Sequence, residues 1–88
     1  MPPDINVIID GIDQAAVIAE IESTIRAVIR EARVDGKWTV RVAASDTRGR
    51  WDLGIRGPAR RHFLSFAAVL DRVPALVGDH LRKALARL

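Results

Sequence analysis

Residues 37–65, KWTVRVAASDTRGRWDLGIRGPARRHFLS, decide the fold, because apolar and polar residues alternate in them with the two-residue period of a β-strand. Pairing Val42 with Leu53 and Val40 with Ile55 places the apolar side chains of two successive strands on the same face of a hairpin. The residues left between the strands, 46–49, begin with Asp and end with Gly, as a type I turn prefers. The side chains predicted to share the apolar face are Trp38, Val40, Val42, Ala44, Trp51, Leu53 and Ile55.

The next stretch, residues 59–70, fits the spacing of a helix and that of a strand equally well. Three observations favour a third strand. Gly57-Pro58 is typical of a turn, and Arg60 and Arg61 would place positive charge at the unfavourable N-terminal end of a helix. A third strand also makes the sheet more stable than a hairpin alone. A helix over these residues is the alternative.

Two segments on either side of this region have the apolar spacing of amphipathic helices. Residues 14–33 form the first predicted helix, with Asp13 as its expected N-cap. A second helix is predicted to begin near Asp71 as its N-cap, with Pro74 in its first turn. The first helix is rich in β-branched residues, which are poor helix formers, so we expect packing against a sheet to stabilise it.

These elements follow each other in the order α-β-β-β-α, which predicts an α+β fold of two layers. We expect a three-stranded antiparallel meander with both helices packed on one face, in a single domain over residues 1–88. Residues 5–9, INVII, are uniformly apolar and predict either an extra N-terminal edge strand or a helical lead-in. Residues 1–3 are expected to be disordered.

The composition limits the classes of protein to which the chain can belong. It has 88 residues, no cysteine and 49% hydrophobic residues, which is typical of a small globular domain without disulfides. No segment approaches the roughly 18 apolar residues that span a bilayer, and the N-terminus lacks the pattern of a signal peptide. We therefore expect a cytoplasmic protein with no membrane partner. A core of this size gives little net stability, and because oligomerisation is a common remedy, a homodimer is predicted.

The residues that catalysis requires are scarce. The chain has two histidines, His62 and His80, and neither cysteine nor tyrosine. On a strand, His62 and Ser65 would lie on opposite faces, so no Ser–His pair is expected. The histidine spacing does not match a zinc site, and the glycines do not form a phosphate-binding motif. The sequence therefore predicts a non-catalytic protein with no metal site and no cofactor.

Charge is distributed unevenly along the chain. Residues 1–36 carry three arginines and seven acidic residues, a net charge of −4, whereas residues 37–88 carry eleven basic and four acidic residues, a net charge of +7. Because helices are expected to cover the apolar face of the sheet, the opposite face should be an exposed basic surface. We predict that this surface, or an edge of the sheet, binds a protein partner or a second copy of the chain. The arginines predicted to contact the partner are Arg41, Arg48, Arg50, Arg56, Arg60 and Arg61.

Nucleic acid, as duplex RNA or DNA, is the alternative partner, since arginines attract phosphates. The order α-β-β-β-α is similar to that of double-stranded RNA-binding domains, and Gly57-Pro58, His62 and Arg82-Lys83 resemble that family's GP-x-H loop and basic C-terminal helix. This resemblance implies binding to duplex RNA. Here, however, the Gly-Pro turn follows the second predicted strand, whereas in that family it follows the first, so no family is assigned. Both tryptophans are expected to face the core, which leaves Phe63 to stack on a base.

Overall fold

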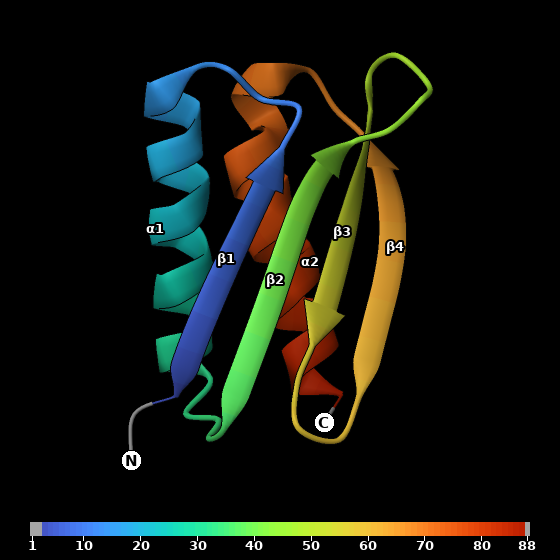
Figure 1. Cartoon of the computed structure of the whole chain (residues 1–88). Coiled ribbons are helices and arrows are strands. Elements are labelled where there is room, and N and C mark those ends of the chain that lie inside the picture. The colour runs from blue at the N-terminus through green and yellow to red at the C-terminus, as the bar shows by residue number, and fades with distance from the viewer. Residues whose placement is uncertain (1–2, 88) are drawn as a thin grey trace.

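The computed structural model describes residues 3–87, which form a four-stranded sheet and two α-helices (Figure 1). The expectation that residues 1–3 are disordered falls largely on Met1 and Pro2, which lie outside the described residues. In chain order the elements are β1 (Asp4–Asp10), α1 (Ala15–Glu31), β2 (Lys37–Ala44), β3 (Arg50–Arg56), β4 (Arg61–Ala67), a 3-10 turn (Leu70–Arg72) and α2 (Val73–Ala86).

The molecule has two layers, with the sheet on one side and both helices on the other (Figure 1). The strands lie in the order β1-β2-β3-β4, and β2, β3 and β4 form the antiparallel meander predicted from the sequence. The α+β class is therefore confirmed, together with the placement of both helices on one face. Within residues 3–87, neither helix has the length and apolar composition needed to cross a membrane.

The N-terminal segment forms an edge strand, which was one of the two alternatives for residues 5–9. β1 pairs in parallel with β2, from Asp4 opposite Lys37 to Asp10 opposite Ala43. Parallel neighbours need a long crossover connection, and α1 provides it. The sheet is therefore mixed, with a parallel strand added to the antiparallel meander.

The hairpin of β2 and β3 has the register that alternation predicted, with Val42 opposite Leu53 and Val40 opposite Ile55. The Ser45 amide donates to the Arg50 carbonyl at 3.0 Å and closes the loop over residues 46–49. Because a shift of one residue would turn every apolar side chain to the wrong face, burial on one side determines this register.

The ambiguous third segment is a strand, so the helical alternative for residues 59–70 is wrong. β4 alternates in burial along its length, with Phe66 in the core and Phe63 exposed. The β3–β4 connection at residues 57–60 is closed by the Gly57 amide, which donates to the Arg60 carbonyl at 2.9 Å. Apolar spacing did not distinguish a strand from a helix here, whereas the turn residues and the unfavourable charge at a helix N-terminus predicted the strand.

The core lies between the helices and the sheet and is made of aliphatic side chains. Ile21, Ile25 and Ile29 of α1 are fully buried, as are Val40 and Leu53 of the sheet. Withdrawing such a side chain from water contributes about 1.5–3 kcal/mol. This packing explains how a helix rich in β-branched residues is stable.

Both tryptophans face the core side of the sheet, as predicted. Trp38 is buried and its indole N–H donates to the Asp35 carbonyl at 2.9 Å; Trp51 is half-buried and donates to the Ala68 carbonyl at 2.9 Å. An indole N–H that leaves water needs such an acceptor. The two hydrogen bonds tie the sheet to the α1–β2 connection and to the β4–α2 connection.

The predicted helix caps are wrong in detail. Gln14, rather than Asp13, is the N-cap of α1, and its side chain makes no capping hydrogen bond. Asp71 lies inside the 3-10 turn, and α2 begins at Val73 with Pro74 in its first turn. Tertiary packing of the apolar stripe therefore sets where these helices begin, and side-chain capping contributes little.

Gly78 allows the two helices to approach each other closely. A Cβ atom added there would lie 2.9 Å from Thr24 Cγ2 of α1. We expect Gly78→Ala to lower the free energy of unfolding by about 1–3 kcal/mol, because overpacking outweighs the better helix propensity of alanine. Urea unfolding measures this change. Adding Thr24→Ser, which removes the obstructing methyl group, should restore most of the loss, and a gain in stability from Gly78→Ala alone would contradict the close approach.

Candidate functional site

The face of the sheet opposite the helices is left uncovered, and we call it the open face. The alternating burial of the four strands assigns every second side chain to it. β1 and β2 contribute Asp4, Asn6, Ile8, Asp10, Lys37, Thr39, Arg41 and Ala43, and β3 and β4 contribute Arg50, Asp52, Gly54, Arg56, Arg61, Phe63, Ser65 and Ala67.

One row of four residues crosses the middle of the open face. The strand registers place Ile8, Arg41, Gly54 and Phe63 side by side, one from each strand. Phe63 is 74% exposed and Ile8 is 38% exposed. Within residues 3–87 these are two of the three exposed large hydrophobic residues, so apolar surface is concentrated in this row.

A shallow hollow of about 230 Å³ lies between Arg41 and Phe63 and extends toward Thr39, Arg56 and Arg61. Its floor is Gly54, which has no side chain, and Arg41 and Phe63 stand on either side of it. A Cβ added to Gly54 would meet nothing nearer than 4.0 Å, and the backbone there is not left-handed. A larger residue would thus fit, so neither local sterics nor backbone geometry requires glycine at this position.

Charge changes sign across the open face. β1 contributes Asp4 and Asp10, whereas the far strands contribute Arg50, Arg56 and Arg61. The sequence prediction of a basic face is therefore incomplete, because it did not include the acidic residues of β1. The sequence signal for the acidic side was the alternation of polar residues with Ile5, Val7 and Ile9. The apolar character of the whole segment concealed this alternation.

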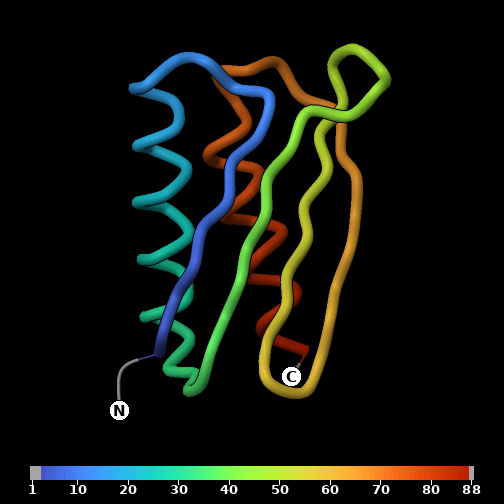
Figure 2. The backbone as a smooth tube through the Cα atoms, viewed as in Figure 1, coloured from blue at the N-terminus to red at the C-terminus, as the bar shows by residue number. Residues whose placement is uncertain are grey.

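The six predicted arginines are spread over the whole length of the sheet (Figure 1). Arg48 lies in the β2–β3 turn at one end, and Arg60 lies in the β3–β4 turn at the other. Arg60 Nη1 donates to the Arg87 carbonyl at 3.3 Å, so this arginine holds the end of α2. Figure 2 shows that the chain enters β1 and leaves α2 at this same end. The other four, Arg41, Arg50, Arg56 and Arg61, lie on the open face.

Arg41 is paired within the sheet. Its Nε and Nη2 atoms both donate to Asp10 Oδ2, at 3.1 and 3.0 Å. Both side chains are more than half exposed, and pairs of this kind contribute about 0–1 kcal/mol. The pair directs the guanidinium toward β1, on the side of β2 away from Gly54, without fixing it strongly.

Arg56 and Arg61 lie directly opposite each other on β3 and β4. Both are exposed, and within residues 3–87 neither forms an ion pair with an acidic side chain. Like charges in facing positions repel and destabilise a sheet. This pair is therefore a position where an acidic partner would relieve a local repulsion.

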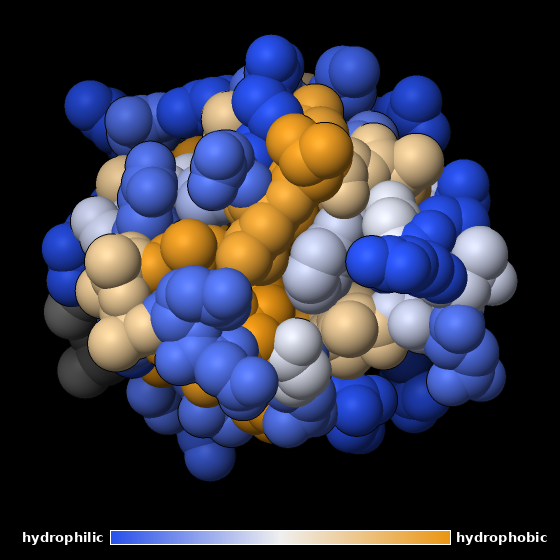
Figure 3. Space-filling view, turned by 90° about the horizontal axis from the view of Figure 1, so that it is seen from above, coloured by the Kyte–Doolittle hydropathy of each residue, from blue (hydrophilic) through white to orange (hydrophobic). Residues whose placement is uncertain are grey.

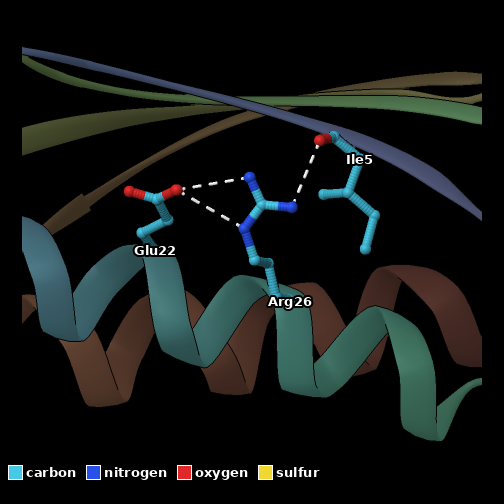
Figure 4. Close-up of polar contacts among 3 residues, drawn as sticks. All are labelled: Ile5, Glu22 and Arg26. Atoms are coloured by element: carbon cyan, nitrogen blue, oxygen red, sulfur yellow. Dashed lines mark hydrogen bonds and ion pairs between the residues drawn. The ribbon is translucent and has the colours of Figure 1, made fainter.

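The two edges of the sheet differ in accessibility. At β1, Arg26 of α1 reaches over the edge, and its Nη1 atom donates to the Ile5 carbonyl at 3.4 Å while the Glu22 carboxylate holds the same guanidinium at 3.2 Å (Figure 4). β4, at the other edge, pairs only with β3. Arg26 thus occupies part of the β1 edge and hinders strand addition there.

A second apolar area lies away from the open face. Viewed from above, the upper end of the molecule shows a hydrophobic band between hydrophilic flanks (Figure 3). Val69, which is 69% exposed, lies in the β4–α2 connection at this end. It provides an exposed apolar side chain that does not belong to the sheet surface.

The histidines and Ser65 do not come together. His62 points to the helix side of β4, whereas Ser65 lies on the open face and donates to Asp52 Oδ1 at 2.7 Å. His80 packs against the Phe66 ring at a centroid distance of 5.2 Å. In the part of the chain that the structure describes, no three His, Asp or Glu side chains are grouped to hold a metal ion.

The chain matches no protein-family model, and no curated protein shows significant similarity to it. The function must therefore be argued from the residues of the open face.

The Arg56–Arg61 repulsion predicts the effect of a charge reversal. We expect Arg61→Glu to raise the free energy of unfolding by about 0.2–1 kcal/mol, because it replaces two facing like charges by an opposite pair. Urea unfolding at low salt measures the gain, which should shrink as salt screens it. Arg48→Glu, in a turn without a facing arginine, is the control. A loss of stability in Arg61→Glu would show that Arg61 already has a favourable partner.

Proposed function

We propose that this domain is a non-catalytic protein-interaction module that binds its partner through the open face of the sheet. The observation that carries the proposal is the central row, in which two exposed apolar side chains stand on either side of an arginine and a glycine-floored hollow. We further propose that it acts in the cytoplasm, because a fold without disulfides does not depend on an oxidising compartment.

The residue types support a protein partner. Aromatic residues and arginine are enriched in protein interfaces and carry much of their binding energy. Phe63, as the most exposed large hydrophobic residue described, is suited to be the anchor, with Arg56 and Arg61 beside it. The acidic side chains of β1 favour a partner that presents both signs of charge, which a polyphosphate backbone does not.

An experiment with matched variants tests this proposal. Phe63→Glu should reduce binding of the cellular partner by about tenfold or more, as expected for an interface anchor. Val69→Glu changes an equally exposed apolar residue off the face and should leave binding unchanged. Quantitative affinity capture from the source cells, with both variants checked for folding, gives the comparison. Equal capture by all three proteins would refute the open face as the binding surface.

Nucleic acid is a second candidate, favoured by the unpaired arginines Arg56 and Arg61 next to the exposed Phe63 ring. Such a group suits a phosphate with a base stacked beside it. If it binds RNA or DNA, affinity should fall steeply as salt rises, and removing both arginines should reduce the salt slope by about two. Fluorescence anisotropy with duplex and single strands measures this. Absence of binding at low salt eliminates the candidate.

A further inference from the structure

We propose that the partner of the open face is a second copy of this chain, stacked face to face about a two-fold axis parallel to the strands. The inference rests on the proposed function, because it takes the open face as the binding surface. It adds the identity of the partner and the geometry of the assembly.

Such an axis places each strand opposite a different strand of the second copy. β1 of one copy lies across from β4 of the other, and β2 lies across from β3. Residues at the same height along the strands then face each other. In the central row, Ile8 then faces Phe63 of the second copy, and Arg41 faces Gly54 of the second copy. A long side chain in the middle of the face meets the position that has none, so the surface is complementary to itself, as a two-fold interface requires.

The charges agree with this pairing. Arg61 of β4 lies level with Asn6 of the second copy, and the acidic Asp4 lies two residues away along the same β1 strand. Arg41 faces Gly54 of the second copy and keeps its ion pair with Asp10 of its own chain. It lies diagonally across from Asp52 of the second copy, two residues from Gly54 on the same face. A charge that loses water at an interface needs such compensation. Arg61 and Asp4 of the second copy are therefore diagonal neighbours of opposite charge at both edges of the stacked sheets.

A two-fold axis that runs across the strands would also stack the faces, but it fits less well. It would place each strand opposite the same strand of the second copy. Residues on one side of the central row would then face residues from the other side of that row. Arg41 would then face Arg41 of the second copy, two glycines would leave the hollow empty, and β1 would face another acidic β1. Repulsion and poor packing thus favour the axis along the strands.

The size of the face sets the expected strength. Four strands about 4.8 Å apart and about seven residues long, at about 3.3 Å per residue, make a face of roughly 19 × 23 Å, or ~440 Å² of planar area per copy. The two faces together make ~880 Å² of planar area, which is below the lower limit of about 1,000 Å² for a stable specific interface. We therefore expect a reversible dimer whose population depends on protein concentration and on salt.

Sedimentation velocity across a concentration series tests whether the dimer forms. The wild-type chain should change from monomer to dimer as concentration rises, and Gly54→Val should weaken dimerisation about tenfold or more by filling the hollow. The same variant should raise the midpoint of urea unfolding, because valine is favoured in a strand and fits the space. Weakened dimerisation with increased fold stability separates an interface effect from misfolding.

Crosslinking tests the axis, and the cysteine-free chain is a clean background for it. A mixture of Ile8→Cys and Phe63→Cys proteins, treated with a short bis-maleimide, should give covalent heterodimers. Neither protein alone should crosslink to itself. Efficient self-crosslinking of Phe63→Cys would instead support the axis across the strands and overturn the proposed geometry.

The outcomes distinguish this inference from the function on which it rests. A wild-type chain that stays monomeric at every concentration, while Phe63→Glu still abolishes capture of a different protein or of nucleic acid, overturns the second copy as partner and leaves the open face as a binding surface. A monomer whose capture is unaffected by Phe63→Glu overturns both. A dimer that Gly54→Val does not weaken overturns the stacking of open faces.

Discussion

Burial of the sheet on one side only is the constraint on which the rest of the structure depends. Both helices pack on the same face, so each strand directs most of its apolar side chains that way and its other side chains outward. This single requirement fixes the register of β2 and β3 and places both tryptophans toward the core. It also determines which residues reach solvent together, and hence the composition of the open face.

The open face is more apolar in its centre than folding requires. A benzene ring that is 74% exposed contributes little to the core, and a glycine in a central strand weakens the strand without a steric reason at that position. Facing arginines add a repulsion. These three features each reduce the stability of the isolated chain, and all three lie on one surface. Their common location is the basis for assigning binding to that surface.

Much of the fold could be predicted from the sequence, because it depends on short-range patterns. Alternation and turn residues were sufficient for the β2–β3 register, and the Gly57-Pro58 turn with its neighbouring arginines was sufficient for β4. The helix caps were not predictable in this way, since Gln14 caps α1 without a side-chain hydrogen bond and packing sets the boundary. Propensity rules describe isolated helices better than helices held by a core.

The candidate site was only partly predictable. Four of the six predicted arginines lie on the open face, but the acidic residues Asp4 and Asp10 were missed, because the pairing of β1 is a long-range property that its own apolar run does not encode. The bond from Arg60 to the end of α2 likewise depends on the tertiary structure. The Gly54 hollow became visible only when the registers placed Arg41 and Phe63 on either side of it.

The most direct test of the open face as the interface between two copies of the chain is a dilution series followed by two-dimensional 1H–15N NMR. Dissociation on dilution should shift the amide signals of the sheet, with the largest changes at Ile8, Arg41, Gly54 and Phe63, and leave those on the outer surfaces of α1 and α2 unchanged. Shifts confined to the helices, or to the connection around Val69, would contradict the assignment of binding to the open face.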